Sequence, residues 1–300
     1  MAPLGCALAL TAFLLFPTVY SHGFVHNVVA NGETFPGWFP FDDPTKVPVP
    51  DKVVRKVKSD GPVPGNDPDI ACGIGGQTGT KVIADADAGS QVAFQWAYWP
   101  GDHLGPVSTY MTSCNGDCTT FDVTGARWFK IDAAGYDNGQ WASAKLIADG
   151  SSWTSTIPAG LAPGQYLLRH EIIALHSIGQ PQYYPSCAQV RVGGAGTGVP
   201  SDASFVSFPG LYDNVTFPDI YTDFGSFTIP GPPLVSFSGS NGNPAAAVAA
   251  SSTVVSNPSG ASSSRMPSAS ALATQKPSAQ CLLASRRLRR RGLRSVRRQW

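Results

Sequence analysis

A histidine follows the apolar N-terminal stretch of the chain. If the chain were cleaved directly before it, this histidine would carry a free α-amine and could chelate a metal ion. Residues 1–16 are apolar and lack acidic side chains, and Val19 and Ser21 have the small or medium size typical of a signal-peptidase site. Cleavage after Ser21 would make His22 the first residue of the mature chain. The α-amine and Nδ1 of a terminal histidine can chelate one metal ion. The sequence therefore predicts a signal peptide over 1–21 and a metal ligand at His22.

A second imidazole is available in a loop that follows an expected strand. His103 lies within Trp-Pro-Gly-Asp-His-Leu-Gly-Pro-Val, residues 99–107. A histidine taken alone is more often structural, but His22 needs one more imidazole to complete a T-shaped set of three nitrogens. Such nitrogen-rich planar geometry favours copper over magnesium or calcium, and zinc prefers a tetrahedron. We therefore expect one copper ion per domain.

Polar residues between positions 170 and 187 are of types that could contact such a metal or hydrogen-bond its other ligands. Gln182 and Tyr184 point to the same face of an expected strand, because side chains alternate along strands. A buried tyrosine beside the metal would be an axial ligand, while Gln182 and His176 could hydrogen-bond the oxidant. The alternative is a core tyrosine with ordinary polar strand residues. Only the combination with His22 and His103 favours a site.

The elements that must position these residues are expected to be strands. Short stretches of strand character lie at 91–96, 128–131, 166–173 and 188–192, separated by connections rich in proline and glycine. Helical periodicity is weak. This pattern predicts an all-β fold, an antiparallel β-sandwich of the immunoglobulin or fibronectin III kind with long loops. Residues 31–69 contain eight prolines and are expected to form a long surface loop.

The cysteines fit an oxidising compartment. Cys114 and Cys118 could bridge a tight turn, which would leave Cys72 and Cys187 for a long-range disulfide. A zinc site built from the same four cysteines is the alternative, although paired Cys-x-x-Cys units are absent. The apolar N-terminal run is too short for a comfortable membrane span and no later run approaches twenty residues, so we expect a secreted, extracellular protein that is not in a membrane.

Charge and composition divide the chain in two. Residues 22–232 carry 11 Lys and Arg and 20 Asp and Glu, a net charge of −9, whereas residues 233–300 carry ten basic residues and no acidic one. An acidic domain argues against nucleic-acid binding. We expect a domain over 22–233, a disordered Ser-, Ala- and Pro-rich linker over 234–280 and an Arg-rich tail over 281–300. The tail is a solvated basic segment, a gene-model artefact or a polyanion-binding segment.

Several of these pieces occur in the order found in one enzyme family. They are His22-Gly23, Asp102-His103-Leu104-Gly105-Pro106-Val107, Arg169-His170-Glu171-Ile172-Ile173-Ala174-Leu175-His176, Gln182-Tyr183-Tyr184-Pro185-Ser186-Cys187 and Phe227-Thr228-Ile229-Pro230-Gly231-Pro232. Across residues 22–233 the chain resembles the fungal lytic polysaccharide monooxygenases of auxiliary activity family 9, formerly glycoside hydrolase family 61. Each piece alone is weak, but the ordered set is specific.

The resemblance implies a role for each matching position. His22 and His103 would form the copper-binding histidine brace, with Tyr184 axial and His176 and Gln182 orienting the oxidant. Cys72 and Cys187 would form the family's long-range disulfide. Tyr212 would lie on a flat face and stack on a sugar ring. Asn214 begins a glycosylation sequon, Asn-Val-Thr.

The resemblance also implies an activity. We expect a monomer that cleaves cellulose or a related β-1,4-glucan oxidatively at C1 and/or C4. It would use O₂ or H₂O₂ and an external electron donor that reduces Cu(II) to Cu(I). A hydrolase would need two carboxylates that flank the bond, and no such pair is recognisable. A secreted copper-binding protein without catalytic activity is the other alternative, although such a protein would not need His176, Gln182 or Tyr212.

Two departures from the family pattern bear on the site. The segment between His176 and Gln182 is shorter than in relatives, so Gln180 competes with Gln182, although only Gln182 keeps the two-residue step to Tyr184. The linker also ends without a recognisable carbohydrate-binding module. Binding to solid substrate would then depend on the surface of the domain itself.

Overall fold

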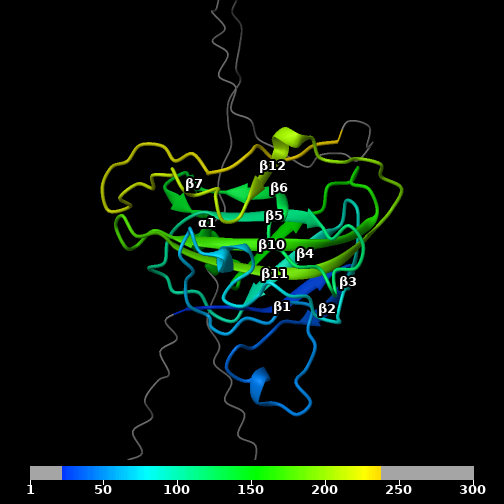
Figure 1. Cartoon of the computed structure of the whole chain (residues 1–300). Coiled ribbons are helices and arrows are strands. Elements are labelled where there is room, and N and C mark those ends of the chain that lie inside the picture. The colour runs from blue at the N-terminus through cyan, green and yellow to red at the C-terminus, as the bar shows by residue number, and fades with distance from the viewer. Residues whose placement is uncertain (1–21, 238–300) are drawn as a thin grey trace, which may run out of the picture. The chain divides into compact units, whose positions relative to one another are not determined.

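Two packed β-sheets form the part of the chain that positions the candidate ligands (Figure 1). The structure is a computed structural model that describes residues 22–237. The smaller sheet has the strand order β2 (Glu33–Pro36), β1 (Val25–Ala30), β4 (Gln91–Trp96) and β9 (Ser152–Thr156). The larger sheet has the order β12 (Phe205–Ser207), β6 (Arg127–Ala134), β5 (Val107–Ser113), β10 (Gly164–Ala174), β11 (Gln182–Gly193) and β3 (Ala84–Asp87).

The predicted all-β sandwich is confirmed, with two differences in detail. Strand β3 pairs in parallel with β11, whereas the other strand pairs of the described residues are antiparallel. One short α-helix, α1 (Ala142–Ala148), follows a small hairpin of β7 (Tyr136–Asp137) and β8 (Gln140–Trp141). Three 3-10 turns complete the elements: η1 (Asp43–Thr45), η2 (Pro68–Ala71) and η3 (Asp202–Ser204).

The larger sheet is buried on both faces, which explains its apolar central strands. On β10, Leu168 and Ile172 pack into the core between the two sheets. The neighbouring residues Leu167 and Ile173 point the other way, into a second apolar cluster. Strand alternation accounts for this division. Residues 205–227 contribute to the second cluster, so this late segment of the chain covers the outer face of the larger sheet.

The proline-rich segment 31–69 is only partly the surface loop that we expected. Its first part contains β2 and η1, and Val47 is 98% exposed. Its middle part is buried, however: Arg55 is fully buried, and Val54 and Val63 make isolated bridges to β11. The segment therefore packs across β11 instead of projecting into solvent along its whole length.

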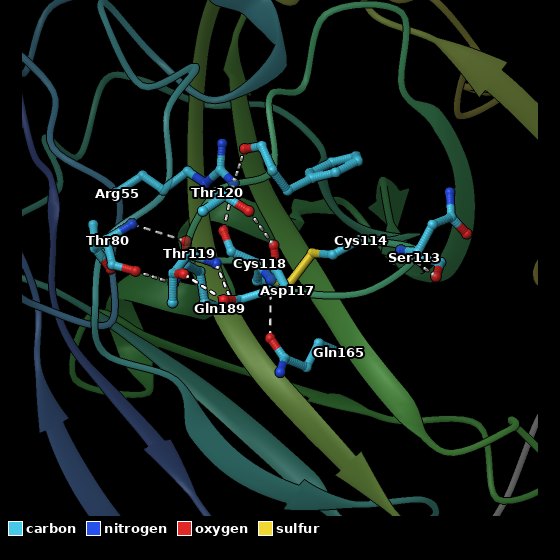
Figure 2. The surroundings of a disulfide bond; sticks show 12 residues. Arg55, Thr80, Ser113, Cys114, Asp117, Cys118, Thr119, Thr120, Gln165 and Gln189 are labelled. Atoms are coloured by element: carbon cyan, nitrogen blue, oxygen red, sulfur yellow. Dashed lines mark hydrogen bonds between the residues drawn. A yellow bond between two sulfur atoms is a disulfide. The ribbon is translucent and has the colours of Figure 1, made fainter.

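Both expected disulfides are present. Cys72–Cys187 joins the end of η2 to β11 across 115 residues, and Cys114–Cys118 closes a short loop after β5. The structure rules out the zinc alternative because all four cysteines are paired. Figure 2 shows the short loop held from both sides. The Cys118 N–H donates to Gln165 Oε1 at 2.9 Å, and the Arg55 guanidinium donates to the Cys118 carbonyl at 3.4 Å.

The C-terminal strap, residues 224–237, packs against the sandwich and extends past the expected boundary at 233. Lys130 Nζ donates to the Pro230 carbonyl at 2.6 Å, and the Val235 N–H donates to the Lys130 carbonyl at 3.0 Å. Phe237 packs against the core. The packed domain therefore reaches at least residue 237. The expected signal peptide over 1–21, most of the linker over 234–280 and the tail over 281–300 lie outside the described residues.

Candidate metal centre

Three of the predicted ligands converge although they come from distant parts of the chain. The ring centroids are 5.9 Å apart for His22 and His103, 5.7 Å for His22 and Tyr184, and 6.3 Å for His103 and Tyr184. His22 precedes β1, His103 lies in the loop before β5, and Tyr184 lies on β11. The fold thus brings together one residue from each of three segments.

Two glycines allow the loops that carry the histidines to approach the sheets closely. A Cβ on Gly23 would lie 1.8 Å from the Tyr98 carbonyl oxygen, and a Cβ on Gly105 would lie 1.8 Å from the Ile173 carbonyl oxygen. Neither distance is compatible with a side chain. Gly23 and Gly105 therefore let the chain segments next to His22 and His103 lie directly against neighbouring backbone.

The loop that carries His103 is fixed by backbone hydrogen bonds to α1 and to the residue that follows β10. The Leu175 N–H donates to the Leu104 carbonyl at 2.8 Å, and the Ser143 N–H donates to the Gly105 carbonyl at 3.1 Å. Trp99 Nε1 donates to the His103 carbonyl at 3.0 Å. His103 itself is 8% exposed. The backbone that carries the ring is thus fixed on both sides of His103.

Tyr184 is a buried phenol held by its neighbours. Its side chain is 3% exposed, its ring makes a T-shaped contact with Trp99 at 5.0 Å, and its hydroxyl donates to Gln182 Oε1 at 2.7 Å. Burial raises the pKa of Tyr184, and the negative charge of Asp60 raises it further. Tyr184 is therefore a neutral phenol, which would be available as a neutral oxygen donor to a metal held by the two histidines.

His176 and Gln182 lie beside this group. The His176 ring stacks on His103 with 3.9 Å between centroids, and Gln182 contacts Tyr184 through the hydrogen bond given above. Burial lowers the pKa of His176, and the His103 ring lowers it further. Gln180 is exposed in the turn between β10 and β11. Of the two glutamines, Gln182 is the one that lies next to Tyr184.

The donor set fits copper. Among residues 22–237, no three or more His, Cys, Asp or Glu side chains are arranged to hold a metal ion, so this centre depends on other donors as well. Two imidazoles, a terminal amine and a neutral phenol form a nitrogen-rich set of the kind that suits copper. In the uncleaved chain the His22 nitrogen belongs to a peptide bond and cannot serve as an amine. The fit therefore depends on cleavage before His22.

The expectation that Tyr212 lies on an exposed face was wrong. Its side chain is 7% exposed, its ring stacks on Tyr183 with 4.5 Å between centroids, and its hydroxyl donates to Glu171. Glu171 is fully buried and also accepts two hydrogen bonds from Arg169, at 2.8 and 2.6 Å. Tyr212 belongs to the cluster that covers the outer face of the larger sheet, where its hydroxyl satisfies a buried carboxylate.

A different tyrosine, which sequence reasoning missed, is exposed beside the centre. Tyr221 is 65% exposed and its hydroxyl donates to the His176 carbonyl at 3.2 Å. Asp219 Oδ1 accepts from the Tyr221 N–H at 2.9 Å, an Asx turn that fixes the backbone there. The signal that could have found it is the aspartate two residues before Tyr221, which predicts an Asx turn at this position.

Two further observations concern glycosylation and membranes. Asn214 is exposed in a turn, so its side chain is accessible to modification. Within residues 22–237, no helix has both the length and the apolar character needed to cross a membrane.

Comparisons with known proteins connect this geometry to a family. Residues 22–228 match Auxiliary Activity family 9 (formerly GH61). The chain is 45% identical over 232 residues to AA9 family lytic polysaccharide monooxygenase A of Gloeophyllum trabeum, covering 72% of each chain. It is 42% identical over 236 residues to monooxygenase B of the same fungus, covering 71% of this chain and 91% of the relative.

Solved structures give the same family. The extended catalytic domain of H. jecorina LPMO9A superposes with a TM-score of 0.67 at 38% identity, covering 72% of this chain and 91% of that one. A cellulose-active polysaccharide monooxygenase from M. thermophila superposes with a TM-score of 0.62 at 33% identity, covering 72% and 99%. The chain therefore belongs to auxiliary activity family 9, the copper-dependent lytic polysaccharide monooxygenases, and is an oxidoreductase.

Proposed function

We propose that this protein is secreted, is cleaved before His22 and oxidatively cleaves a β-1,4-linked glucan, with cellulose as its substrate, at C1 and/or C4. The observation that carries the proposal is the convergence of His22, His103 and Tyr184 from three distant segments. The oxidant is O₂ or H₂O₂, and an external donor supplies electrons. The protein works as a monomer with one copper ion per domain.

Each residue of the centre has a separate task in this proposal. The His22 amine, one His22 ring nitrogen and one His103 ring nitrogen would hold the copper. The buried Tyr184 phenol lies beside both histidine rings and would shield one side of the metal from solvent. When bound there, copper supplies one-electron redox chemistry that activates the oxidant for hydroxylation of a sugar carbon. His176 and Gln182 provide polar groups next to this position, where they orient the oxidant by hydrogen bonding.

The proposed substrate surface is centred on Tyr221 instead of Tyr212. Tyr221 is exposed, and its hydroxyl is hydrogen-bonded to the backbone of His176. Its ring therefore lies beside a residue of the metal centre. Aromatic rings can stack on the apolar faces of sugars. A neutral glucan carries no charge that the acidic domain would repel. That one structurally similar relative is described as cellulose-active also supports cellulose.

The remaining segments have proposed roles that follow from composition. Residues 1–21 are a signal peptide and 22–237 are the catalytic domain with its strap. The linker expected over 234–280 then begins after residue 237, and 281–300 are a basic tail. The exposed Asn214 carries an N-linked glycan in the secreted protein.

A product analysis tests this function. The copper-loaded chain that begins at His22 is incubated with amorphous cellulose and ascorbate, and the soluble products are analysed by mass spectrometry. Aldonic acids or 4-ketoaldoses are the expected products. Native oligosaccharides alone would indicate a hydrolase, and copper binding without products would indicate a non-catalytic copper protein.

A pair of histidine variants tests the ligand assignment in the same assay. His103→Ala removes a proposed ligand, so oxidised products should disappear and copper affinity should fall. His26→Gln is the matched control, because His26 lies on β1 close to His22 in sequence but outside the group of three rings. This variant should retain both properties. If His103→Ala formed oxidised products at the wild-type rate, the assignment of His103 as a ligand would be wrong.

A further inference from the structure

The carboxylate of Asp102 lies against the ring of the neighbouring candidate ligand. Asp102 Oδ1 is 2.8 Å from His103 Nδ1, a charge-assisted hydrogen bond. The His103 side chain is 10% exposed and that of Asp102 is 75% exposed. Within the described part of the chain, no lysine or arginine forms a salt bridge with Asp102, so none competes with His103 for the carboxylate.

The turn that contains both residues keeps the carboxylate beside the ring. The His103 N–H donates to the Pro100 carbonyl at 3.1 Å, and the Leu104 N–H donates to the Asp102 carbonyl at 2.9 Å. On its other side, the His103 ring stacks on His176. The ring is thus restrained by a hydrogen bond at its edge and by a stacking contact on its face.

Elementary hydrogen-bond chemistry then fixes which ring nitrogen can bind a metal. An ionised carboxylate only accepts hydrogen bonds, and a neutral imidazole has a single N–H. The proton of His103 must therefore be on Nδ1, which leaves the lone pair of Nε2 as the metal donor. His22 differs, because chelation together with its own α-amine requires Nδ1. The two histidines would thus present different ring nitrogens.

We propose that Asp102 is a positioning residue of the metal centre, which holds the Nδ1–H tautomer of His103 and directs Nε2 to the metal. Carboxylates that accept from metal-bound histidines fix the tautomer and raise the basicity of the ligand. A more basic ligand and a nearby negative charge also favour Cu(II) over Cu(I). This inference rests on the proposed function, because it assigns Asp102 a role toward the proposed copper ligand.

Substitutions of Asp102 in the chain that begins at His22 test the inference without measuring turnover. The first measurement is ¹⁵N NMR of the histidine rings in the metal-free protein. Wild type should show His103 protonated at Nδ1, and Asp102→Ala should show a mixture of tautomers. Asp102→Asn keeps a neutral acceptor and should retain more of the wild-type tautomer. An unchanged tautomer in Asp102→Ala would overturn the proposal.

Copper binding supplies the second measurement. Asp102→Ala should bind Cu(II) about 10-fold or more weakly in competition with a chelator. Its Cu(II) EPR spectrum should change, and its reduction potential should rise. Asp85→Ala is the matched control, because the Asp85 carboxylate is similarly exposed, at 69%, and pairs with Arg191 far along the sequence. This control should match wild type in both measurements.

The outcomes separate failure of this inference from failure of the proposed function. If wild type binds no copper, or if His103→Ala binds it as tightly as wild type, the copper site itself is wrong and so is the role of Asp102. If wild type binds copper, His103→Ala does not, and Asp102→Ala retains wild-type affinity and EPR spectrum, only the positioning role of Asp102 is overturned.

Discussion

Each polar side chain at the metal centre contacts a second residue that restricts its orientation. Gln182 accepts from the Tyr184 hydroxyl, and the His176 ring lies flat against His103. The exposed Tyr221 is tied to the His176 carbonyl. Catalytic geometry of this kind has to be held closely, since small displacements of reacting groups lower rates strongly. At this scale, the function depends as much on the supporting contacts as on the ligands.

The first prediction concerns the proposed sugar-binding ring. Tyr221→Ala should bind cellulose about 2- to 12-fold more weakly, because one aromatic stacking contact contributes about 0.5–1.5 kcal/mol. Copper affinity should not change. Tyr221→Phe is the control, since it keeps the ring and loses only the hydrogen bond to His176. It should retain most of the binding. Binding isotherms on solid cellulose measure the effect, and equal binding by all three proteins would contradict it.

Tyr212 gives the opposite prediction, because its role is structural. Tyr212→Phe deprives the buried Glu171 of one hydrogen-bond donor, which should lower the free energy of unfolding by about 1–3 kcal/mol. Binding to cellulose should remain at the wild-type level. Urea unfolding and cellulose-binding isotherms of the same samples measure the two effects. If Tyr212→Phe bound cellulose more weakly and kept its stability, Tyr212 would contact the sugar after all, and its structural role would be wrong.

At the scale of elements, a polar chain links the two sheets inside the sandwich. His170 Nδ1 on β10 lies 3.1 Å from the Thr109 hydroxyl on β5, which lies 2.8 Å from the Ser155 hydroxyl on β9. The Ser155 hydroxyl donates to the Asp132 carboxylate on β6 at 2.8 Å. The His170 ring stacks on Phe94 of β4 at 4.5 Å. A fully buried histidine thus sits in the interface between the sheets.

This histidine predicts a loss of stability in acid. Burial, followed by the charge of Arg169, lowers the pKa of His170 from 6.5 to about 3. Between these pH values the unfolded chain binds more protons than the folded chain, so acid favours unfolding. The stability that depends on neutral His170 is therefore fully present above about pH 6.5. It falls with decreasing pH by up to about 1.4 kcal/mol per pH unit. His170→Phe should flatten the pH dependence of the unfolding free energy across this window. Urea unfolding at several pH values measures it, and parallel curves for the two proteins would contradict the assignment.

The parts of the architecture that could be predicted from sequence are those with local signals. The alternation in 91–96 predicts β4, and the apolar N-terminal run predicts His22 as the mature N-terminus and therefore as a possible ligand. The parallel pairing of β3 with β11 depends on contacts between distant residues and leaves no local pattern. The burial of Tyr212 depends likewise on how residues 205–227 fold over the larger sheet. Position within a loop therefore could not distinguish it from Tyr221.

At the scale of the whole molecule, the C-terminal strap closes the domain. Phe227 makes a T-shaped contact with Trp141 at 5.1 Å, and Lys130 donates to the Pro230 carbonyl. Lys130 is 3% exposed, and burial lowers its pKa to about 8. The strap thus supplies an acceptor for a buried cation and covers apolar surface. The candidate ligands and their supporting residues all lie between His22 and residue 237.

Two truncations test this division of the chain. A protein spanning residues 22–237 should bind copper and oxidise amorphous cellulose like the chain that continues to Trp300, because it keeps the centre and the strap. A protein ending at Asp223 loses Phe227, Pro230 and the remaining strap contacts. Burying one large apolar side chain contributes about 1.5–3 kcal/mol, so several such losses should lower the melting temperature by roughly 10 °C or more. Calorimetry of the metal-free proteins measures this effect. Equal melting temperatures for the two truncations would show that the strap does not stabilise the domain. If the protein spanning residues 22–237 failed to oxidise cellulose, residues 238–300 would be needed for the activity.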